Sequence, residues 1–219
     1  MKNSADHLKE KNKYLELCYS EEHLKQHLEK TLNNHTPKKY IFEKVKSRPA
    51  AVLIPIYFKK DEAHILFTKR TDIVEHHKGQ ISFPGGSLDP EDADLKFTAL
   101  RETEEEVGIK KQDIQIVGQT DIFLTNTHFL VTPYVGFFAY PYPFTVNGDE
   151  IDRLISVPLR HFFDEQNFEV KPYEKENYNW LIHYYYFNHD VIWGVTGFLL
   201  SNFLSIAFGL NRNLFNPSK

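Results

Sequence analysis

The 219-residue chain has one cysteine, no long apolar run and no excess of positive charge, and each absence excludes a class of protein. Cys18 has no second cysteine for an intrachain disulfide, which fits a reducing compartment. No apolar run is long enough to span a bilayer, and residues 1–13 lack the apolar region of a signal peptide. We therefore expect a cytoplasmic protein without a membrane partner.

The charge balance argues against nucleic acid as a partner. The chain has 26 Lys and Arg against 30 Asp and Glu, which gives a formal net charge of −4. Proteins that coat nucleic acid are basic. A nucleotide-sized substrate is still compatible with this balance, because a few cations can be concentrated in one cleft.

Internal repeats and low-complexity tracts are absent as well, and the length fits one large domain. Leucines at helical spacing in the polar residues 1–36 predict one or two amphipathic helices, broken near Tyr19–Ser20. We expect an N-terminal helical extension over residues 1–36 and a main domain over 37–219. The extension is interpreted as a packing helix, and a dimerisation or lid element is the alternative.

Apolar and alternating patterns predict the remaining elements. We expect strands over residues 50–58, 63–70, 80–83, 114–124, 130–140, 154–159, 180–187 and 191–193, and an apolar helix over 196–210. Pro55 is expected at a bulge or a sheet edge. This order of strands, helix, strands and helix fits a mixed sheet between layers of helices, an α/β fold.

Residues 83–109 contain a glycine turn, an acidic loop and a helix. The paired Gly85 and Gly86 let the backbone approach a ligand closely. Asp92 or Asp94 is the candidate N-cap of a helix over residues 95–107. Gly108 follows that helix, where a C-terminal glycine stop belongs.

Three carboxylates share one face of this helix, because Glu102, Glu105 and Glu106 are spaced i, i+3 and i+4. Crowded carboxylates repel unless a cation offsets their charge. All-oxygen ligation suits Mg²⁺ first and Mn²⁺ second, and a phosphate or pyrophosphate is the natural companion. A solvated acidic face is the alternative. The glycine turn and the embedded Arg101, which can hold Glu105 at i+4, favour a metal site.

The nine residues 101–109, RETEEEVGI, resemble the second half of the Nudix box, R-E-U-x-E-E-x-G-U with U aliphatic. The first half departs from the box, since Asp92 replaces a glutamate and one extra residue separates it from Arg101. Thr103 replaces the aliphatic residue. An aspartate with one extra residue is the variant of the coenzyme A pyrophosphatase branch, and Asp92 is expected to reach a metal through water.

That branch carries a second motif, L-L-T-x-R-S/A-x3-R-x3-G-x3-F-P-G-G, and residues 66–86 match its spacing throughout. Arg70 keeps its position and is interpreted as a substrate contact. Glu75 stands where the motif has arginine, which reverses a charge. The three residues that follow are the candidate cationic contacts in its place: His76, His77 and Lys78.

The resemblance implies the Nudix α/β/α sandwich, and an enzyme that hydrolyses phosphoric anhydrides with Mg²⁺ or Mn²⁺. It also implies that the final helix packs on the acidic helix. The metal ligands it implies are Glu102, Glu105, Glu106 and the carbonyl of Gly86. Arg101 would position a glutamate, and Glu102 would bind a second metal or orient the water.

The general base is expected on a loop beyond the core strands, with Glu150 as the candidate and Asp149 as the second choice. The branch implies cleavage of coenzyme A or its thioesters to phosphopantetheine, or its acyl form, and 3′,5′-ADP. Glu75 leaves an ADP-ribose or nucleoside-diphosphate-sugar pyrophosphatase open. A non-catalytic nucleotide-binding module is the alternative of another class, and the intact glutamates argue against it. A monomer and a homodimer are both compatible with the sequence.

Overall fold

The computed structural model describes residues 12–41, 45–71, 79–175 and 178–212. Its main sheet has nine strands, and their central order is β1 (Lys39–Tyr40), β7 (Ile122–Leu124), β8 (Phe129–Phe137), β2 (Arg48–Lys59), β3 (Glu62–Arg70) and β4 (Ile81–Ser82). Three more strands pair beside this path: β5 (Gly85–Ser87) with β2, β6 (Gln115–Gln119) with β8, and β9 (Ile151–Pro158) with β3.

A second, antiparallel sheet consists of β10 (Phe168–Lys175), β11 (Tyr178–Phe187) and β12 (Asp190–Ile192). The helices are α2 (Glu21–Asn33), α3 (Leu95–Val107) and α4 (Gly194–Phe208), and residues 12–17 are also helical. Short 3-10 turns occupy Lys111–Asp113, Leu159–Phe163 and Glu165–Asn167. None of the helices in the described ranges is both long and apolar enough to cross a membrane.

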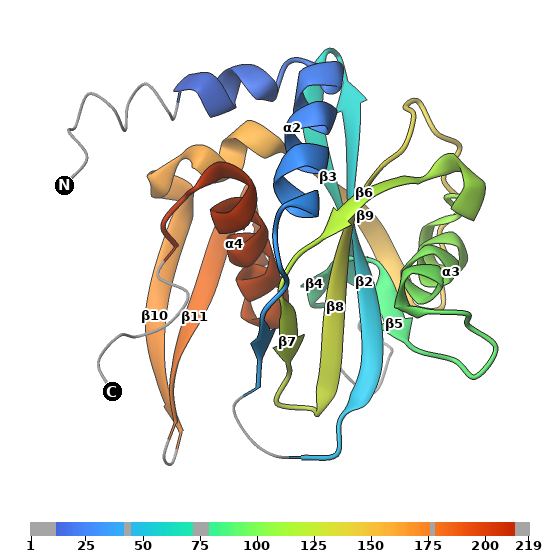
Figure 1. Ribbon diagram of the computed structural model, residues 1–219, viewed down its shortest axis with the longest axis vertical. Helices are drawn as coiled ribbons and strands as arrows, with labels where there is room; N and C mark the ends of the chain where they lie inside the picture. Colours follow the sequence, from blue (N-terminus) through green and yellow to red (C-terminus); the bar gives the residue numbers. More distant parts are fainter. Residues whose placement is uncertain (1–11, 42–44, 72–78, 176–177, 213–219) are drawn as a thin grey trace.

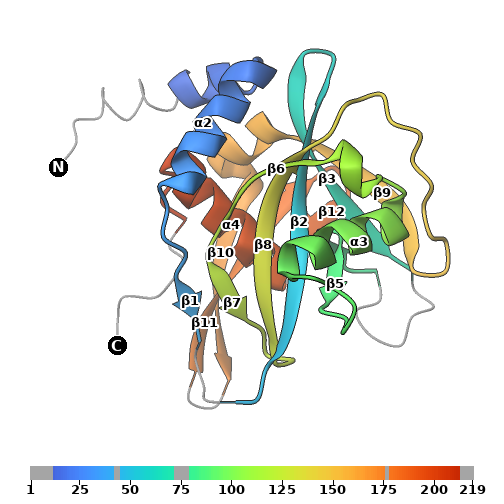
Figure 2. The same ribbon diagram turned by 45° about the vertical axis from the view of Figure 1, so that its right-hand side comes forward.

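Helices cover both faces of the main sheet (Figures 1 and 2). The sheet is mixed, because β2 runs parallel to β8 and antiparallel to β3. Side chains alternate between its faces along β3: Ile65 and Phe67 join the core under α2 and α4, whereas Leu66 joins the core under α3. The predicted arrangement of a mixed sheet between helical layers is confirmed.

The expected packing of the final helix on the acidic helix is wrong. α3 and α4 lie against opposite faces of the sheet and belong to different cores (Figure 2). α4 is buried nearly all round, so it needs cover on every side. It obtains that cover from the main sheet, from α2 and from β11. α3 is buried on one side only, and of its carboxylates Glu105 is exposed whereas Glu106 is buried.

Several strand predictions need correction. β1 and β5 were not predicted, and β5 begins at Gly85, within the expected glycine turn. The strand expected over residues 114–124 is two strands, β6 and β7, with a break at Thr120–Asp121. β10 was not predicted, since its sequence FEVKPYEK is largely polar and contains Pro172.

Pro55 lies between the part of β2 that pairs with β5 and the part that pairs with β3. At this position neither β5 nor β3 requires a backbone N–H from β2, which a proline could not supply.

The N-terminal helix packs onto the fold, as the packing interpretation predicts. Ser20 caps α2 by accepting from the His23 N–H at 3.4 Å. The predicted leucines of α2 are buried, and the helix contacts β6 and α4. Gly118 of β6 allows this close approach, because a Cβ there would lie 2.4 Å from the Cβ of Leu32.

Asp121, at the break between β6 and β7, joins three parts of the chain. Its Oδ1 lies 2.6 Å from His35 Nε2 and accepts from the Lys38 N–H at 2.8 Å. Its Oδ2 accepts from Tyr40 OH at 3.1 Å and from Asn202 Nδ2 of α4 at 2.9 Å. Burial raises the pKa of Asp121, but these hydrogen bonds outweigh burial and hold that pKa below its usual range.

We expect Asp121→Asn to lower the free energy of unfolding at pH 7 by about 2–3 kcal/mol. The new amide nitrogen would face a donor, Asn202 Nδ2 or the Lys38 N–H, whichever way it is turned. Because the folded pKa of Asp121 is depressed, the loss should shrink as the pH falls through that pKa. Urea unfolding followed by circular dichroism measures both effects. Asp152→Asn, at a side chain that is 58% exposed, is the control and should change stability little.

Candidate active site

Both ends of α3 form as the sequence predicts. The Asp94 side chain accepts from the Phe97 N–H at 2.7 Å, and Gly108 ends the helix in the left-handed region with φ 77°. Thr103 and Val107 are buried against the sheet. The helix therefore presents its carboxylates along the edge of its packed side, next to the glycine turn.

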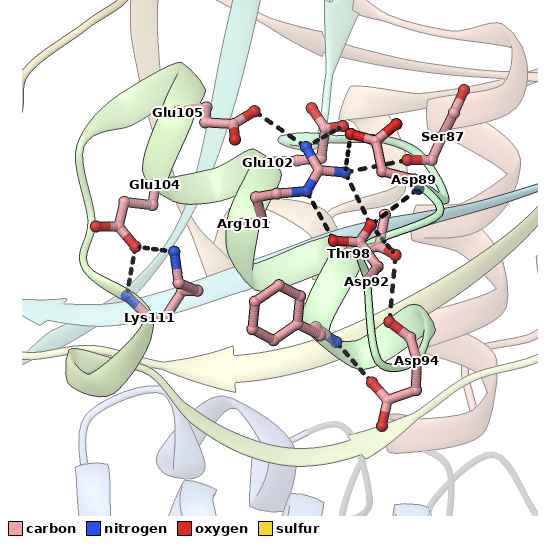
Figure 3. A network of polar contacts seen from close by, with 11 residues as sticks. Ser87, Asp89, Asp92, Asp94, Thr98, Arg101, Glu102, Glu104, Glu105 and Lys111 are labelled. Atoms are coloured by element: carbon pink, nitrogen blue, oxygen red, sulfur yellow. Dashed lines mark hydrogen bonds and ion pairs between the residues drawn. The ribbon is translucent and has the colours of Figure 1, made fainter.

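Arg101 is the centre of an ion-pair network on this helix (Figure 3). Its Nε and Nη2 each donate to one oxygen of Asp92 at 2.9 Å. Its Nη1 donates to Glu102 Oε1 and to Glu105 Oε2, both at 3.0 Å. Asp89 lies 3.6 Å from Nη2. One guanidinium thus neutralises part of a group of four carboxylates.

Asp92 anchors this arginine. Its side chain is 1% exposed, and its Oδ2 also accepts from Thr98 Oγ1 at 2.8 Å and from the Asp89 N–H at 3.0 Å. The hydrogen bonds from Arg101 hold the pKa of Asp92 well below its usual range. Both oxygens are engaged by the chain itself, so Asp92 is placed to hold Arg101 rather than to meet a metal through water.

Gly86 gives Glu102 its place. β5 pairs with β2, with Gly86 opposite Ala51. A Cβ on Gly86 would lie 2.4 Å from Glu102 Oε1, so a larger residue at this position would force the Glu102 carboxylate to move. Burial is the main cause that raises the pKa of Glu102. The two glycines lie in β5 rather than in the expected turn, and Gly86 meets the acidic helix directly at Glu102.

Glu106 is a buried carboxylate with spare bonding capacity. Its side chain is 6% exposed, and within the described ranges its Oε2 has no hydrogen-bond partner. Burial raises the pKa of Glu106 to about 8, although Arg70 and the Gly85 N–H partly oppose this. A buried acceptor without a partner is costly unless a ligand satisfies it.

Arg70, the last residue of β3, links this helix to the loop before β9. Its Nη1 lies 3.9 Å from Glu106 Oε1, and its Nη2 lies 3.6 Å from Glu150 Oε2. The Thr71 N–H donates to the Glu150 carbonyl at 2.9 Å, which fixes the loop end beside β3. Three residues that the sequence analysis selected separately therefore lie together.

The structure brings the selected residues into two adjoining groups, one around Arg101 with Gly86, Glu102 and Glu105, and one around Arg70 with Glu106 and Glu150. His76, His77 and Lys78 lie outside the described residues. Sequence reasoning missed Asp89, which lies 3.6 Å from Arg101 and was recognisable only as a further acid in the loop.

The donors present fit a hard divalent cation. Every candidate side chain is a carboxylate, the Oε2 of Glu106 has no partner among the described residues, and Gly86 leaves a recess that Glu102 fills. In the same ranges no three His, Cys, Asp or Glu side chains converge as a ready metal site. Glu102 and Glu105 are paired with Arg101, whereas Glu106 lies next to Arg70. On metal binding, Glu102 and Glu105 would give up part of their ion pairing with Arg101 and coordinate the metal instead.

A double glycine beside an acidic helix, on a mixed sheet covered on both faces, is the arrangement that the resemblance to the Nudix hydrolases implies. Residues 46–181 match the model of the NUDIX domain. The chain is also 34% identical over 154 residues to the uncharacterized Nudix hydrolase NudL of Yersinia pestis (strain Pestoides F), covering 70% of this chain and 77% of that protein. The chain belongs to the Nudix family and is an enzyme that acts on phosphoric anhydrides.

Solved structures of the family resemble the chain more distantly. An Ap4A hydrolase of C. elegans in a binary complex has a TM-score of 0.44 and 19% identity, covering 51% of this chain and 80% of that one. The NUDIX domain of Shewanella oneidensis NrtR complexed with ADP ribose also has a TM-score of 0.44, with 16% identity over 59% of this chain and 82% of that one.

We predict that Glu106→Gln makes the metal-free protein more stable than wild type at pH 8. The folded pKa of about 8 lies above the ordinary 4.5, so the free energy of unfolding of the wild type falls as the pH rises between these values. The variant lacks this titration, and the two proteins should converge towards pH 4.5. Urea unfolding in the presence of a chelator measures the difference.

Glu104→Gln is the matched control for this measurement. Lys111 lowers the pKa of Glu104, so loss of that charge should destabilise the protein slightly at pH 8. Equal stability of wild type and Glu106→Gln at pH 8 would contradict the burial of an uncompensated carboxylate.

Proposed function

We propose that the enzyme hydrolyses the pyrophosphate bond of coenzyme A or acyl-coenzyme A. The products are phosphopantetheine, or its acyl form, and 3′,5′-ADP, and the cofactor is Mg²⁺ or Mn²⁺. The substrate assignment is supported by the spacing of residues 66–86 and by Asp92 with its extra residue. The observation that carries the site is the buried Glu106, which adjoins the Arg101 network and is linked through Arg70 to Glu150.

The proposed metal ligands are Glu102, Glu105 and Glu106, with the Gly86 carbonyl as an additional ligand. When bound, a divalent cation supplies charge neutralisation at the phosphoryl oxygens and lowers the pKa of a bound water. Arg101 holds the carboxylates of Glu102 and Glu105 in the same place before the metal enters. The bidentate contact with Asp92 fixes the guanidinium itself.

Glu150 is the proposed general base. Its side chain is 47% exposed, so it can meet water, and Arg70 keeps it beside Glu106. The side chain of Asp149 remains the second candidate, on the same turn. Arg70 is the proposed phosphate contact, because a guanidinium between two carboxylates can turn to a phosphoryl oxygen once a cation offsets those charges. His76, His77 and Lys78 are proposed as further cationic contacts.

A substrate panel tests the proposal. The protein is incubated with Mg²⁺ and, separately, coenzyme A, ADP-ribose, UDP-glucose and dinucleoside polyphosphates, and the products are identified by mass. We expect coenzyme A to be cleaved fastest, with 3′,5′-ADP as a product. Much faster cleavage of ADP-ribose or a sugar nucleotide would reject the coenzyme A assignment. Glu106→Gln should lower turnover by about 10²-fold or more, while Glu104→Gln, at a side chain paired with Lys111, should not.

Glu75 favours the second candidate function, a pyrophosphatase for ADP-ribose or nucleoside-diphosphate sugars. It reverses the charge at a motif position that has arginine in the coenzyme A branch. If that position meets a substrate phosphate, Glu75→Arg should raise kcat/KM for coenzyme A by about tenfold, the effect of one charge-assisted contact. Turnover of ADP-ribose by the same variant is the control. No change with either substrate would remove position 75 from the binding site.

A further inference from the structure

The end of α3 holds the loop that carries Glu150. Carbonyls in the last turn of a helix have no partner inside the helix. Here the Thr145 N–H donates to the Val107 carbonyl at 3.1 Å, and the Asn147 N–H donates to the Glu106 carbonyl at 3.0 Å. A Cβ on Gly108 would lie 2.8 Å from the Thr145 nitrogen, so the loop is in close contact with the helix end. The loop leads from β8 past α3 to β9 (Figure 2).

Asn147 then shapes the turn that follows. Its Oδ1 accepts from the Asp149 N–H at 3.2 Å. Its carbonyl accepts from the N–H groups of Glu150 at 3.1 Å and Ile151 at 2.8 Å. An asparagine side chain that bonds the backbone two residues on is the Asx turn, which replaces a backbone hydrogen bond. Asn147 therefore makes four hydrogen bonds, one to Glu106 and three that hold residues 149–151.

We propose that Asn147 is a positioning residue, which sets the place of Glu150 relative to Glu106. This inference rests on the proposed role of Glu150 in the reaction. The backbone of Asn147 bonds the backbone of Glu106, the buried carboxylate. It also bonds the backbone of Glu150, the candidate base, three residues further along the chain. Arg70 and Thr71 complete the frame from the side of β3. Errors of about 1 Å in such a placement cost up to about 10²-fold in rate.

The chain offers matched variants. Asn147→Ala removes the Oδ1 acceptor and keeps the backbone bonds, whereas Asn147→Asp keeps an acceptor for the Asp149 N–H. Gly148→Ala is the control in the same turn, since nothing lies within 4 Å of a Cβ at Gly148. Asn147→Ala should lower kcat about tenfold with KM within about twofold. Asn147→Asp should restore kcat to within about threefold, and Gly148→Ala should leave it unchanged.

A double-mutant cycle with Glu150→Gln tests whether Asn147 acts through Glu150. Glu150→Gln alone should lower kcat about 10²-fold, and the double variant Asn147→Ala/Glu150→Gln should be no slower. The rates are measured with the best substrate of the panel, so a wrong substrate assignment does not affect the cycle. Additive losses, or a wild-type rate in either single variant, would overturn the inference.

Hydrogen exchange of the metal-free proteins gives a readout that is independent of turnover. Exchange of the Asp149 amide, which loses its acceptor, should rise in Asn147→Ala and stay at the wild-type level in Gly148→Ala, with α3 unchanged in both. Unchanged exchange in Asn147→Ala would overturn the positioning role even if the enzyme were slower. A lower melting temperature with normal kcat would assign Asn147 a purely structural role and also overturn it.

Discussion

The site depends on how one short helix holds a group of negative charges before any metal arrives. Arg101 contacts four carboxylates, and the buried Asp92 fixes its orientation from the opposite side. Without that guanidinium the acids would repel one another. Glu106 stands outside this compensation, and burial without a full set of partners makes its ionised form costly. Arg101 therefore compensates most of the acidic helix, and among the buried carboxylates of the described residues Glu106 keeps an oxygen without a partner.

The surrounding fold supports this arrangement from three directions. β5 brings the glycine turn under Glu102, the end of β3 delivers Arg70, and the loop before β9 delivers Glu150. Arg70 ends β3, Gly86 lies in β5, and Glu150 directly precedes β9, so pairing within the main sheet fixes the backbone at each position. Backbone hydrogen bonds, rather than long flexible side chains, set most of these positions.

Much of the helix and its neighbours could be predicted from the sequence. Asp94, Gly108 and the carboxylate spacing define α3 locally, and apolar runs define β2, β3 and β8, because these elements depend on short-range patterns. The break at Asp121 could not be predicted, since its reason is a set of partners from the N-terminal segment and from α4. β10 escaped prediction because pairing with β11, and not its own composition, makes it a strand.

The residues of the site could be predicted from the sequence, but the contacts between them could not. Helical spacing selected Glu102 and Glu106, the resemblance added Arg70 and Glu150, and tertiary contacts bring Arg70, Glu106 and Glu150 together. The role of Asp92 became clear only from its two bonds to Arg101. The place of α4, on the face opposite α3, follows from its being apolar on all sides, which the resemblance had obscured.

Because helices cover both faces of the main sheet, a shorter fragment of this enzyme must include the helices of both faces to bury its core. The family match spans residues 46–181, which leaves out α2, β12 and α4. Those elements contribute many side chains to the core on one face of the main sheet, among them Leu24, Leu28, Ile192 and Phe203. An excised fragment with the family's boundaries would retain every carboxylate of the site yet expose a broad apolar face, and such a face promotes aggregation. Residues 46–181 thus contain the catalytic motif, but the folded core also needs α2 and α4, which lie outside that range.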